Sequence, residues 1–402
     1  VIGGGPAGLV TAIGLALSGR RVTLAAAPHK PGGTDRDRRT AALLGGSIDV
    51  LRNIGAWERC KVASAPLTAI RIIDDTGRIL RAPEVLFTAE EIGAEAFGYN
   101  VPNAALMDAL TAVAAEMPGL DFAATGGIVD VRPGADEVSA TTVEGEMFRA
   151  QLCVASDGRK SLGRAASGIV ARDWHYDQTA IVTWFSHSRP HGGVSTEFHR
   201  PSGPFTTVPL PDQASSLVWV ERREEAQRLA ALDDAPFRQA IQRRLNGLLG
   251  SVTEIGPRAS FPLSALTVAR YGARRIALVG EAAHVIPPIG AQGLNLGFRD
   301  AAALVDCVSE AARNYGDIGS DEVLNRYTAA RGADVGSRVT AVDILNRALL
   351  SPLLPVSIAR GFGLYLLQSI APLRRRVIIE GLMPGGPTPW LMRKTTHALL
   401  DA

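Results

Sequence analysis

Two glycine-rich segments contain the residues whose types and spacing could do chemistry. The first is Gly3-x-Gly5-x-x-Gly8, which lies between an apolar stretch and a helix-forming one. Glycines at this spacing allow a tight turn, a close approach of the backbone to a pyrophosphate, and close packing of helix on strand. The dipole of the following helix favours the negative phosphates. The motif therefore predicts a dinucleotide site, and a tight turn without a ligand is the alternative.

The second segment, GEAAHVIPPIGAQGLNLGFRD over Gly280–Asp300, follows a strand predicted at Arg275–Val279. An acid at the carboxyl end of this strand could hold a ribityl hydroxyl, and the glycines let the backbone approach a flat ring. The helix predicted to begin near Leu294 would point its N–H groups at the negative charge of a reduced flavin. Together the two segments indicate FAD rather than NAD. The residues expected at the cofactor here are Gly280, Glu281, Pro288, Gly290, Gly293, Leu294 and Asn295.

A third motif, Asp157-Gly158, follows the apolar strand predicted at Leu152–Ala155. Alone it is an ordinary turn, but beside the other two motifs its carboxylate could accept a hydrogen bond from a cofactor hydroxyl. One expected piece is missing, because the end of the second strand, Val22–Ala27, offers no acid to hold the adenosine ribose. Either the affinity for FAD is lower, or Arg39 or a backbone group substitutes.

Histidines are the other candidates for chemistry. His284 could be a catalytic base, but we favour a structural histidine that orients the Pro287–Gly290 loop. The spacing of His187, His191 and His199 fits no helical metal motif, so we expect loop or surface histidines and no metal site.

Composition excludes several classes of protein. The 402 residues are 46% hydrophobic, which suits a globular α/β protein of two or three domains. Lys+Arg of 42 against Asp+Glu of 40 leaves a formal charge of +2, which argues against a nucleic-acid binder. Three dispersed cysteines suggest neither disulfides nor zinc and fit a reducing cytosol. The chain begins inside an apolar strand, Val1-Ile2, so we expect a few residues of that strand to precede this numbering.

The predicted elements indicate an α/β fold. Strand, turn, helix (Ala7–Ser18) and strand open the chain, and further helices are predicted at Asn103–Glu116 and Ala235–Leu249. The segment Asp35–Ala56 opens with charged residues and is predicted to continue as a helix, with apolar residues at Ala42, Leu43, Ile48, Leu51 and Ile54. From Thr179 to Val220, short β-rich runs alternate with Pro/Gly turns, a pattern typical of an antiparallel sheet. Everything beyond Asp321 is predicted to be helical.

We therefore expect a Rossmann-like FAD-binding domain with an inserted antiparallel β-sheet substrate domain and a C-terminal helical region. The FAD-binding domain would be discontinuous, made of residues 1–68, 99–168 and 265–330. The β-sheet domain would contain residues 69–98 and 169–264, and the helical region residues 331–402. The interface between the first two is the default place for a substrate pocket.

The chain resembles the class A flavoprotein monooxygenases, which have the p-hydroxybenzoate hydroxylase fold, and within them the UbiH/UbiF-type hydroxylases of ubiquinone biosynthesis. The resemblance spans nearly the whole chain. It departs at Glu281, where an aspartate is usual, and at Pro102–Met107, where the family helix opens with Glu-Asn-Arg. The segments that match are Gly3–Gly8, Asp37–Trp57, Asp157–Ser161, Trp174–Val182, Pro201–Pro204, Gly280–Asp300 and Tyr327–Asn346.

The resemblance implies that Arg39 and Asp157 contact FAD and that the Pro287–Asn295 loop lies beside the isoalloxazine. It also implies the reaction: FAD reduced by NAD(P)H binds O2 as a C4a-hydroperoxide, which hydroxylates the ring of a polyprenylated phenol. The catalytic base stays unassigned, with Tyr176, His191 and His284 as candidates. Two alternatives remain, an FAD-dependent reductase of isoprenoid chains and a non-catalytic member of a ubiquinone-biosynthesis complex.

The tail over Leu349–Met383 is dense in apolar residues and contains Arg374-Arg375-Arg376. A helical layer buried on the FAD-binding domain, or a dimer interface, is one interpretation. The more specific hypothesis is a peripheral membrane surface, whose apolar side chains insert into the bilayer while the arginines contact anionic headgroups. We expect the protein in the cytoplasm. Under the membrane hypothesis it also contacts the inner face of the cytoplasmic membrane.

Overall fold

The computed structural model describes residues 1–29, 39–77, 82–314, 316–350, 363, 365, 366, 368–382 and 387–394. A parallel sheet holds the glycine-rich turn. Ile2 pairs in parallel with Ala25 of β1 (Val22–Ala26) and with Ala155 of β11 (Cys153–Ala155), so it joins two short sheets into one. On one side, β7 (Leu120–Ala124) pairs in parallel with β1. On the other side, β19 (Ile276–Leu278) pairs in parallel with β11, and β18 (Gly272–Ala273) pairs antiparallel with β19. The strand predicted at Arg275–Val279 is confirmed as β19, one residue shorter at each end.

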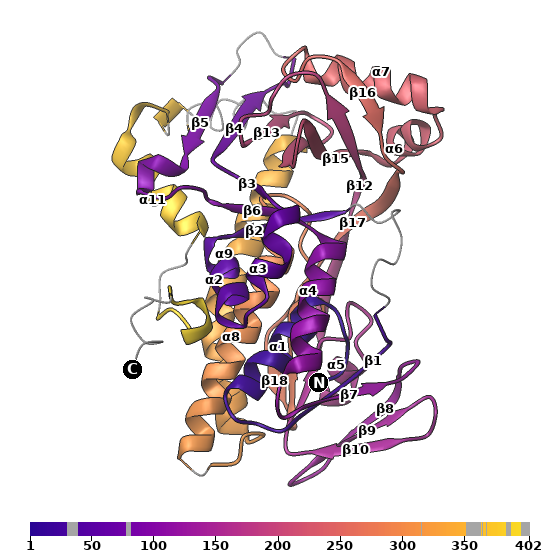
Figure 1. Cartoon of the computed structure of the whole chain (residues 1–402), viewed down its shortest axis with the longest axis vertical. Helices are drawn as coiled ribbons and strands as arrows, with labels where there is room; N and C mark the ends of the chain where they lie inside the picture. The colour runs from indigo at the N-terminus through magenta and orange to yellow at the C-terminus, as the bar shows by residue number, and fades with distance from the viewer. Residues whose placement is uncertain are drawn as a thin grey trace.

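Helices pack on this sheet and on each other (Figure 1). α1 (Pro6–Leu17) begins directly after the glycine turn and contacts both α4 (Asn103–Glu116) and α8 (Gln292–Arg313), and α8 contacts α9 (Asp321–Leu350). The short α5 (Leu162–Ser167) packs against β11 and β19. The helices predicted from periodicity after the glycine turn and at residues 103–116 are confirmed.

A second, eight-stranded sheet crosses the top of the molecule in Figure 1. Its order is β16-β12-β15-β14-β13-β4-β5, with β17 also paired to β12. All neighbours are antiparallel except β13 and β4, so the antiparallel prediction is confirmed with one parallel exception. The strands are β4 (Ala69–Asp74), β5 (Val85–Thr88), β12 (Ala171–His187), β13 (Val194–His199), β14 (Phe205–Leu210), β15 (Ala214–Arg222), β16 (Val252–Ile255) and β17 (Ala259–Val268).

Two helices pack on this sheet, α6 (Arg223–Ala230) and α7 (Asp234–Leu245). The helix predicted at Ala235–Leu249 is therefore confirmed as α7 with shifted ends, whereas α6 was not predicted. Their apolar faces bury a separate core in which Trp219 and Phe237 stack with ring centroids 6.1 Å apart. Burial of such large aromatic side chains gives the sheet its own hydrophobic stabilisation.

Two small antiparallel sheets correct the sequence prediction. The helix expected within Asp35–Ala56 is wrong at Ala42 and Leu43, because β2 (Thr40–Leu44) pairs with β6 (Gly98–Pro102) before α2 (Gly45–Asn53) begins. Asp35 itself lies outside the described residues. The strand predicted at Leu152–Ala155 is confirmed as β11, and it is preceded by β7, β8 (Ile128–Pro133), β9 (Val138–Thr142) and β10 (Met147–Ala150). The remaining short elements are β3 (Ala65–Pro66), α3 (Trp57–Cys60), η1 (Lys61–Ala63), η2 (Ala89–Ile92), η3 (Gly280–Ala282) and η4 (Trp390–Met392).

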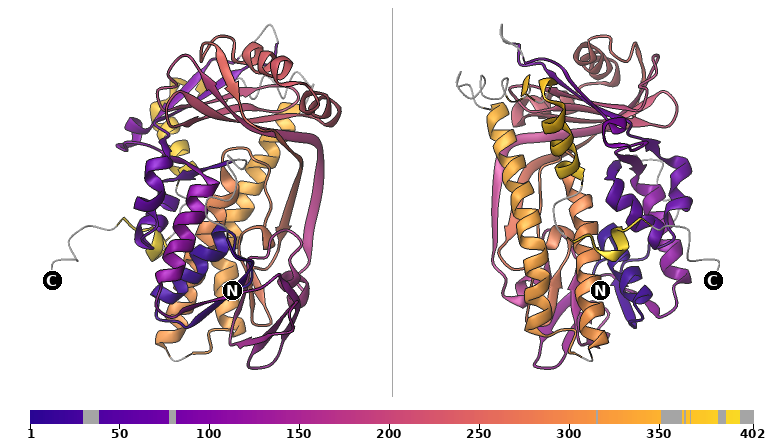
Figure 2. Two further views of the ribbon diagram at one scale, coloured as in Figure 1. Left: turned by 45° about the vertical axis from the view of Figure 1, so that its right-hand side comes forward. Right: turned by 90° about the vertical axis from the view of Figure 1, so that its left-hand side faces the viewer.

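The helical C-terminal part connects the two large sheets. α9 runs along the molecule to β12, where Asp343 accepts a hydrogen bond from Tyr176 over 2.7 Å. α11 (Ala371–Leu382) packs on η2, near β5 (Figure 2). In the part of the chain that the structure describes, no helix combines the length and the apolar character needed to cross a bilayer. The expected α/β fold class is confirmed, and the division into domains stays a prediction.

Candidate functional site: the carboxyl edge of the parallel sheet

The glycine turn is shaped by close contacts with the end of β11. A Cβ on Gly3, whose φ is +102°, would overlap the carbonyl of Ser156, and a Cβ on Gly8 would overlap the Ser156 hydroxyl and the Gly3 carbonyl. At Gly5, by contrast, no described atom lies within 4 Å of a Cβ position. Gly3 and Gly8 therefore serve internal packing, while Gly5 borders open space. Gly5 is also the N-cap of α1 and offers no side chain, so the first N–H groups of α1 stay available for an anion.

Ser156 was not predicted to matter, although it stands directly before Asp157. Its hydroxyl donates to the carbonyl of Ile2 (2.9 Å) or of Gly3 (3.0 Å). The Ser156 N–H also donates to Ile2. These bonds fasten the glycine turn to the carboxyl end of β11, so the first and third sequence motifs lie side by side.

Asp157 has two different oxygens. Oδ2 accepts hydrogen bonds from the N–H groups of Leu162 (2.7 Å) and Gly163 (3.2 Å), and so caps α5. Oδ1 is buried and has no hydrogen-bond partner among the described residues. A buried carboxylate oxygen without a donor is costly, which makes Oδ1 a natural acceptor for a ligand hydroxyl. Gly158 follows with φ +80°, a conformation that favours glycine.

Gly280 and Glu281 lie at the carboxyl end of the neighbouring strand β19. Gly280 has φ +64° and packs against Ala7 of α1, while its N–H donates to Asp300 over 3.0 Å. Glu281 is exposed, and its carboxylate forms no hydrogen bond or ion pair within the described part of the chain. The acid expected from the sequence is therefore present at the strand end and is free to bind.

The loop before α8 turns through two residues with positive φ, Gly290 (+67°) and Ala291 (+54°). Ala291 is the N-cap of α8 and supplies no side-chain cap, and Gly293 in the first turn has no described atom within 4 Å of a Cβ position. The first turn of α8, where the positive end of the helix dipole lies, therefore has no side-chain cap on its N–H groups. Pro288 and Gly290 are exposed beside them, and Leu294 is half-buried.

Asn295 is buried, and its side chain makes four hydrogen bonds to the protein. Its amide donates to the carbonyls of Ala42 (2.8 Å) and Ala291 (2.6 Å). Its oxygen accepts from the N–H of Leu44 (2.9 Å) and from the Ser47 hydroxyl (2.7 Å). Because every hydrogen-bonding position of the side chain is used, Asn295 holds the loop against β2 and α2 rather than offering its side chain to a ligand.

His284 is structural in this arrangement. Its Nε2 lies 2.6 Å from Asp300 Oδ2, and Arg331 Nε donates to Asp300 Oδ1 over 2.6 Å, with all three side chains buried. Burial alone would raise the pKa of Asp300, but the charges of His284 and Arg331 and their hydrogen bonds outweigh it and hold that pKa below its ordinary value. The preference for a structural His284 is thus supported, although its partner is Asp300 and not the proline loop.

Two other candidate bases are also held by the protein. Tyr176 donates to Asp343 and accepts from the Trp174 indole over 2.8 Å. Burial, with the hydrogen bond to Asp343, raises the pKa of Tyr176 to about 12, so it remains protonated near neutral pH. His191 contacts the Leu210 carbonyl through Nε2 and the Gly193 N–H through Nδ1, which fixes a turn before β13.

Arg39 lies before β2, with its guanidinium 5.8 Å from the centre of the Phe261 ring. It is exposed, and its carbonyl accepts the N–H of Asn103 at the start of α4. The Arg39 guanidinium thus lies beside β17 of the eight-stranded sheet. Its expected contact with FAD stays a prediction.

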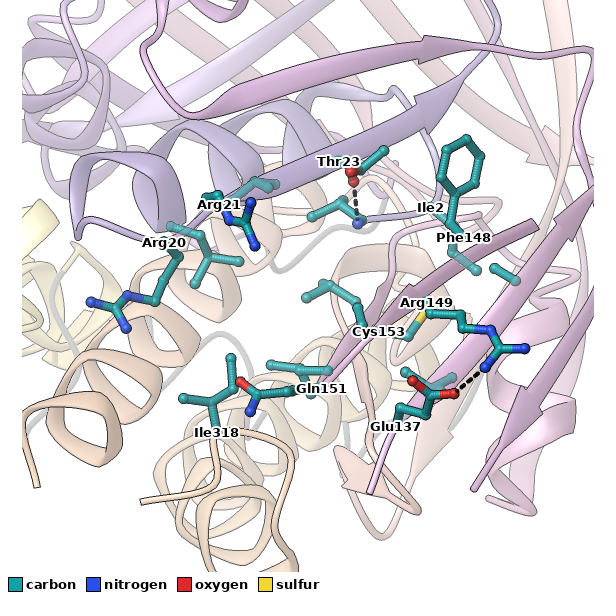
Figure 3. A pocket seen from close by; sticks show the side chains of 18 of the residues that line it. Ile2, Arg20, Arg21, Thr23, Glu137, Phe148, Arg149, Gln151, Cys153 and Ile318 are labelled. Atoms are coloured by element: carbon teal, nitrogen blue, oxygen red, sulfur yellow. Dashed lines mark hydrogen bonds and ion pairs between the residues drawn. The ribbon is translucent and has the colours of Figure 1, made fainter. Parts of the chain in front are cut away.

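A separate cavity of about 1130 Å³ lies at the opposite, amino-terminal ends of β1 and β11 (Figure 3). Figure 3 shows Arg20 and Arg21 on one side of it and Phe148, Arg149 and Glu137 on the other. Arg149 forms an ion pair with Glu137 over 2.9 Å. Asp157 follows the carboxyl end of β11, and the glycine turn follows Ile2, which pairs in parallel with β1 and β11. The cavity at the amino-terminal ends of these strands is therefore distinct from the candidate site.

The residues at the carboxyl edge fit FAD. Gly5 and the start of α1 border open space that suits a pyrophosphate. Asp157 Oδ1 and Glu281, which have no partner among the described residues, suit hydroxyls, and the start of α8, which has no side-chain cap, suits an electron-rich ring. In doubly wound sheets this edge is where ligands bind.

Comparison with known proteins agrees. Residues 1–342 match the model of a family described as the FAD binding domain. Ubiquinone hydroxylase UbiL of Rhodospirillum rubrum is 34% identical over 398 residues, which cover 98% of this chain and 92% of that protein. The 3-demethoxyubiquinol 3-hydroxylase of Escherichia coli is 29% identical over 383 residues, which cover 94% of this chain and 96% of that protein. Among solved structures, p-nitrophenol 4-monooxygenase of Pseudomonas putida has a TM-score of 0.76 at 17% identity, and the match covers 95% of this chain and 97% of the monooxygenase chain.

The chain therefore belongs to this family of FAD-binding proteins, the class A flavoprotein monooxygenases. It is an FAD-dependent enzyme, as the sequence motifs predicted.

Proposed function

We propose that this chain is an aromatic-ring hydroxylase of ubiquinone biosynthesis, acting on a polyprenylated phenol with O2 and with electrons from NAD(P)H. The names of the relatives from Rhodospirillum rubrum and Escherichia coli support the pathway and the reaction class. The observation that carries the proposal is the convergence of the Gly5 turn, Asp157 Oδ1, Glu281 and the α8 start at one edge of the parallel sheet.

FAD would supply the activation of O2 and the transfer of one oxygen atom to the ring. The chain's own residues would bind and orient it. In the proposal Gly3 and Gly8 shape the turn, Gly5 leaves room for the pyrophosphate, and Arg39, Asp157 and Glu281 contact polar groups of the cofactor. The first turn of α8 would stabilise negative charge on the reduced ring through its N–H groups.

The substrate ring would lie between the α8 start and the large sheet. The small sheet of β2 and β6 already joins these parts: the Thr40 hydroxyl donates to the Ser216 hydroxyl over 3.0 Å, and the Asn100 amide donates to the Pro209 carbonyl over 2.8 Å. These contacts would hold the large sheet against the start of α8, so that the substrate is positioned beside the cofactor site and water is excluded. Because a polyprenyl tail keeps the phenol in the bilayer, the proposal includes membrane contact and work beside other enzymes of the pathway.

A bacterial strain that lacks its own ring hydroxylase tests the proposal. Expression of this chain should convert the accumulated precursor into a product one oxygen atom heavier, with ubiquinone restored. The matched control is Gly8→Val, which should lose FAD because a side chain overlaps the Gly3 carbonyl. A product with a reduced prenyl chain would instead assign a reductase. Purified protein that stays colourless with added FAD would point to a non-catalytic complex member.

A further inference from the structure

The carboxyl end of β1 lacks the acid that usually accompanies the glycine motif. β1 ends at Ala26, and Ala27, Pro28 and His29 follow. Ala26 lies against the glycine turn, because a Cβ on Gly4 would come within 2.7 Å of the Ala26 Cβ. In dinucleotide sites of this topology, a carboxylate at this strand end binds the hydroxyls of the adenosine ribose. Another element must therefore supply that carboxylate if this chain holds the ribose in the same way.

Helix α4 brings a carboxylate to this place. β7 follows α4 and pairs in parallel with β1, so α4 starts at the carboxyl edge of the sheet and runs back toward the other edge. It also packs against α1. Asp108 lies in the second turn of α4, and its Oδ1 is 2.6 Å from Nε2 of His29. Because His29 stands three residues after Ala26, this contact places the Asp108 carboxylate beside the end of β1.

The pair of His29 and Asp108 keeps hydrogen-bonding capacity for a ligand. The two side chains are 24% and 42% exposed, respectively. Within the part of the chain that the structure describes, the Asp108 carboxylate forms no other hydrogen bond or ion pair. Its Oδ2 is therefore available to accept. An ion pair with this much exposure adds little to stability on its own, so stability alone does not account for the arrangement.

We propose that Asp108 binds the adenosine ribose of FAD and that His29 positions it, so that the pair replaces the acid absent at Ala26. The inference rests on the proposed placement of FAD at the carboxyl edge of the parallel sheet. A carboxylate can only accept hydrogen bonds, so Nε2 of His29 donates to Oδ1 and leaves Oδ2 for the ribose hydroxyls. Arg39, the substitute suggested by the sequence, lies instead beside Phe261 of β17.

Two flavins test the proposal on the full-length protein, namely FAD and an FAD analogue whose adenosine ribose lacks both hydroxyls. Protein loaded with either flavin is diluted, and the rise of flavin fluorescence on release gives each Kd. Asp108→Ala removes the carboxylate, His29→Ala removes its donor, and His29→Gln keeps an N–H donor. Glu116→Ala is the matched control, because Glu116 pairs with Arg59 over 2.9 Å at the opposite end of the same helix.

We expect wild type to bind the analogue about tenfold or more weakly than FAD, since this is the usual effect of losing a hydrogen bond to a charged group. Asp108→Ala should raise the Kd for FAD by a similar factor and leave the Kd for the analogue unchanged, because the partner hydroxyls are already missing. His29→Ala should lose part of the preference for FAD, and His29→Gln should retain it. Glu116→Ala should match wild type with both flavins.

Equal weakening of both flavins in Asp108→Ala would overturn the proposal, because a purely structural role does not depend on the ribose hydroxyls. An unchanged Kd for FAD in that variant would overturn it as well. Gly5→Ala tests the placement of FAD separately, since it should weaken both flavins alike, and full affinity for both would overturn the placement and this inference with it. Neither Kd depends on oxygen transfer, so the result is independent of the reaction assigned to the enzyme.

Discussion

Arg338 and Gln292, 46 positions apart in the chain, meet through a 2.9 Å hydrogen bond from Nη1 to Oε1. Gln292 in turn donates from its amide to the Gly290 carbonyl over 2.7 Å, so the turn before α8 is held by a side chain that α9 positions. Asp334 fixes the other edge of the Arg338 guanidinium over 2.9 Å. Arg338 and Gln292 together position the first turn of α8. The proposed flavin site depends on the N–H groups of this turn.

Replacing Arg338 with Met should therefore weaken FAD binding without unfolding the protein. Loss of one hydrogen bond to a charged group typically costs about 1.5–3 kcal/mol, which corresponds to a factor of about ten or more in Kd. FAD affinity is measured by quenching of flavin fluorescence, and the visible spectrum of the bound flavin should shift. Arg347→Met is the control on the same helix, because Arg347 pairs with Asp343 and makes no contact with the loop. Unchanged affinity and spectrum in Arg338→Met would remove this positioning role.

The glycine turn allows packing and ligand binding to be separated. Gly8→Ala should lower both the Tm of the apoprotein and FAD affinity, since its methyl group overlaps Gly3 and Ser156. Gly5→Ala has open space around the new methyl group, so the apoprotein should keep its Tm while FAD affinity falls. Gly332→Ala in α9 is the control and should be neutral or stabilising by up to about 1 kcal/mol. Full FAD affinity in Gly5→Ala would place the pyrophosphate elsewhere.

Glu281 should act on the cofactor alone. Because its carboxylate is exposed and bonds to no described residue, Glu281→Ala should change apoprotein stability by no more than about 0.5 kcal/mol. FAD affinity should fall by about tenfold in Glu281→Ala and less in Glu281→Asp, which restores the acid usual in the family. Equilibrium titration of the three proteins with FAD makes the comparison, and three equal dissociation constants would exclude Glu281 from the site.

The buried pair of Asp300 and Arg331 should dominate acid stability. Asp300→Asn removes the fully buried carboxylate that pairs with Arg331 and leaves Asp334 as the remaining carboxylate on that guanidinium, and loss of a buried ionic partner typically costs about 3–5 kcal/mol. Glu225→Gln at the exposed pair with Arg228 is the control and should have little effect. Denaturant unfolding compares the three proteins, and a small change in Asp300→Asn would contradict the assignment of this pair as a structural anchor.

The pH dependence of the unfolding free energy follows from two carboxylates of this buried cluster, Asp300 and Asp334. The folded-state pKa values of Asp300 and Asp334 are held below the ordinary value, so these carboxylates stabilise the fold above about pH 4 and lose that contribution as pH falls through their lowered values. Wild-type unfolding free energy should therefore drop steeply below about pH 4. The drop should be shallower in Asp300→Asn, and an identical pH profile in both proteins would contradict the account.

Much of this arrangement could be predicted from local sequence. Glycine spacing, the Asp-Gly motif and the segment from Gly280 to Asp300 located every strand end of the site, because each is a contiguous pattern with one physical reason. The sequence failed where partners are distant. Part of β2 was predicted as helix because periodicity alone cannot assign a short apolar run such as Ala41–Leu44, and only pairing with β6 decides between helix and strand. Nothing local reveals that Asn295 is fully used by the protein or that Arg338 meets Gln292.

The three arginines of α11 show the same limit. They are equivalent in the sequence, but Arg374 faces Glu91 whereas Arg375 and Arg376 face outward. The helix period could have suggested the division, yet which face is buried depends on β5 and η2, which precede α11 by more than 270 residues.

The most direct test of the central claim is the origin of the oxygen in the product. Purified FAD-loaded protein is reduced with NAD(P)H and mixed with a prenylated phenol under isotope-labelled dioxygen, and the product is examined by mass spectrometry. We predict one labelled oxygen atom in the aromatic ring, formed in proportion to bound FAD and absent in Gly8→Val. A ring product that takes its oxygen from water, or a prenyl chain that gains hydrogen while the ring stays unchanged, would contradict a flavin-dependent hydroxylase.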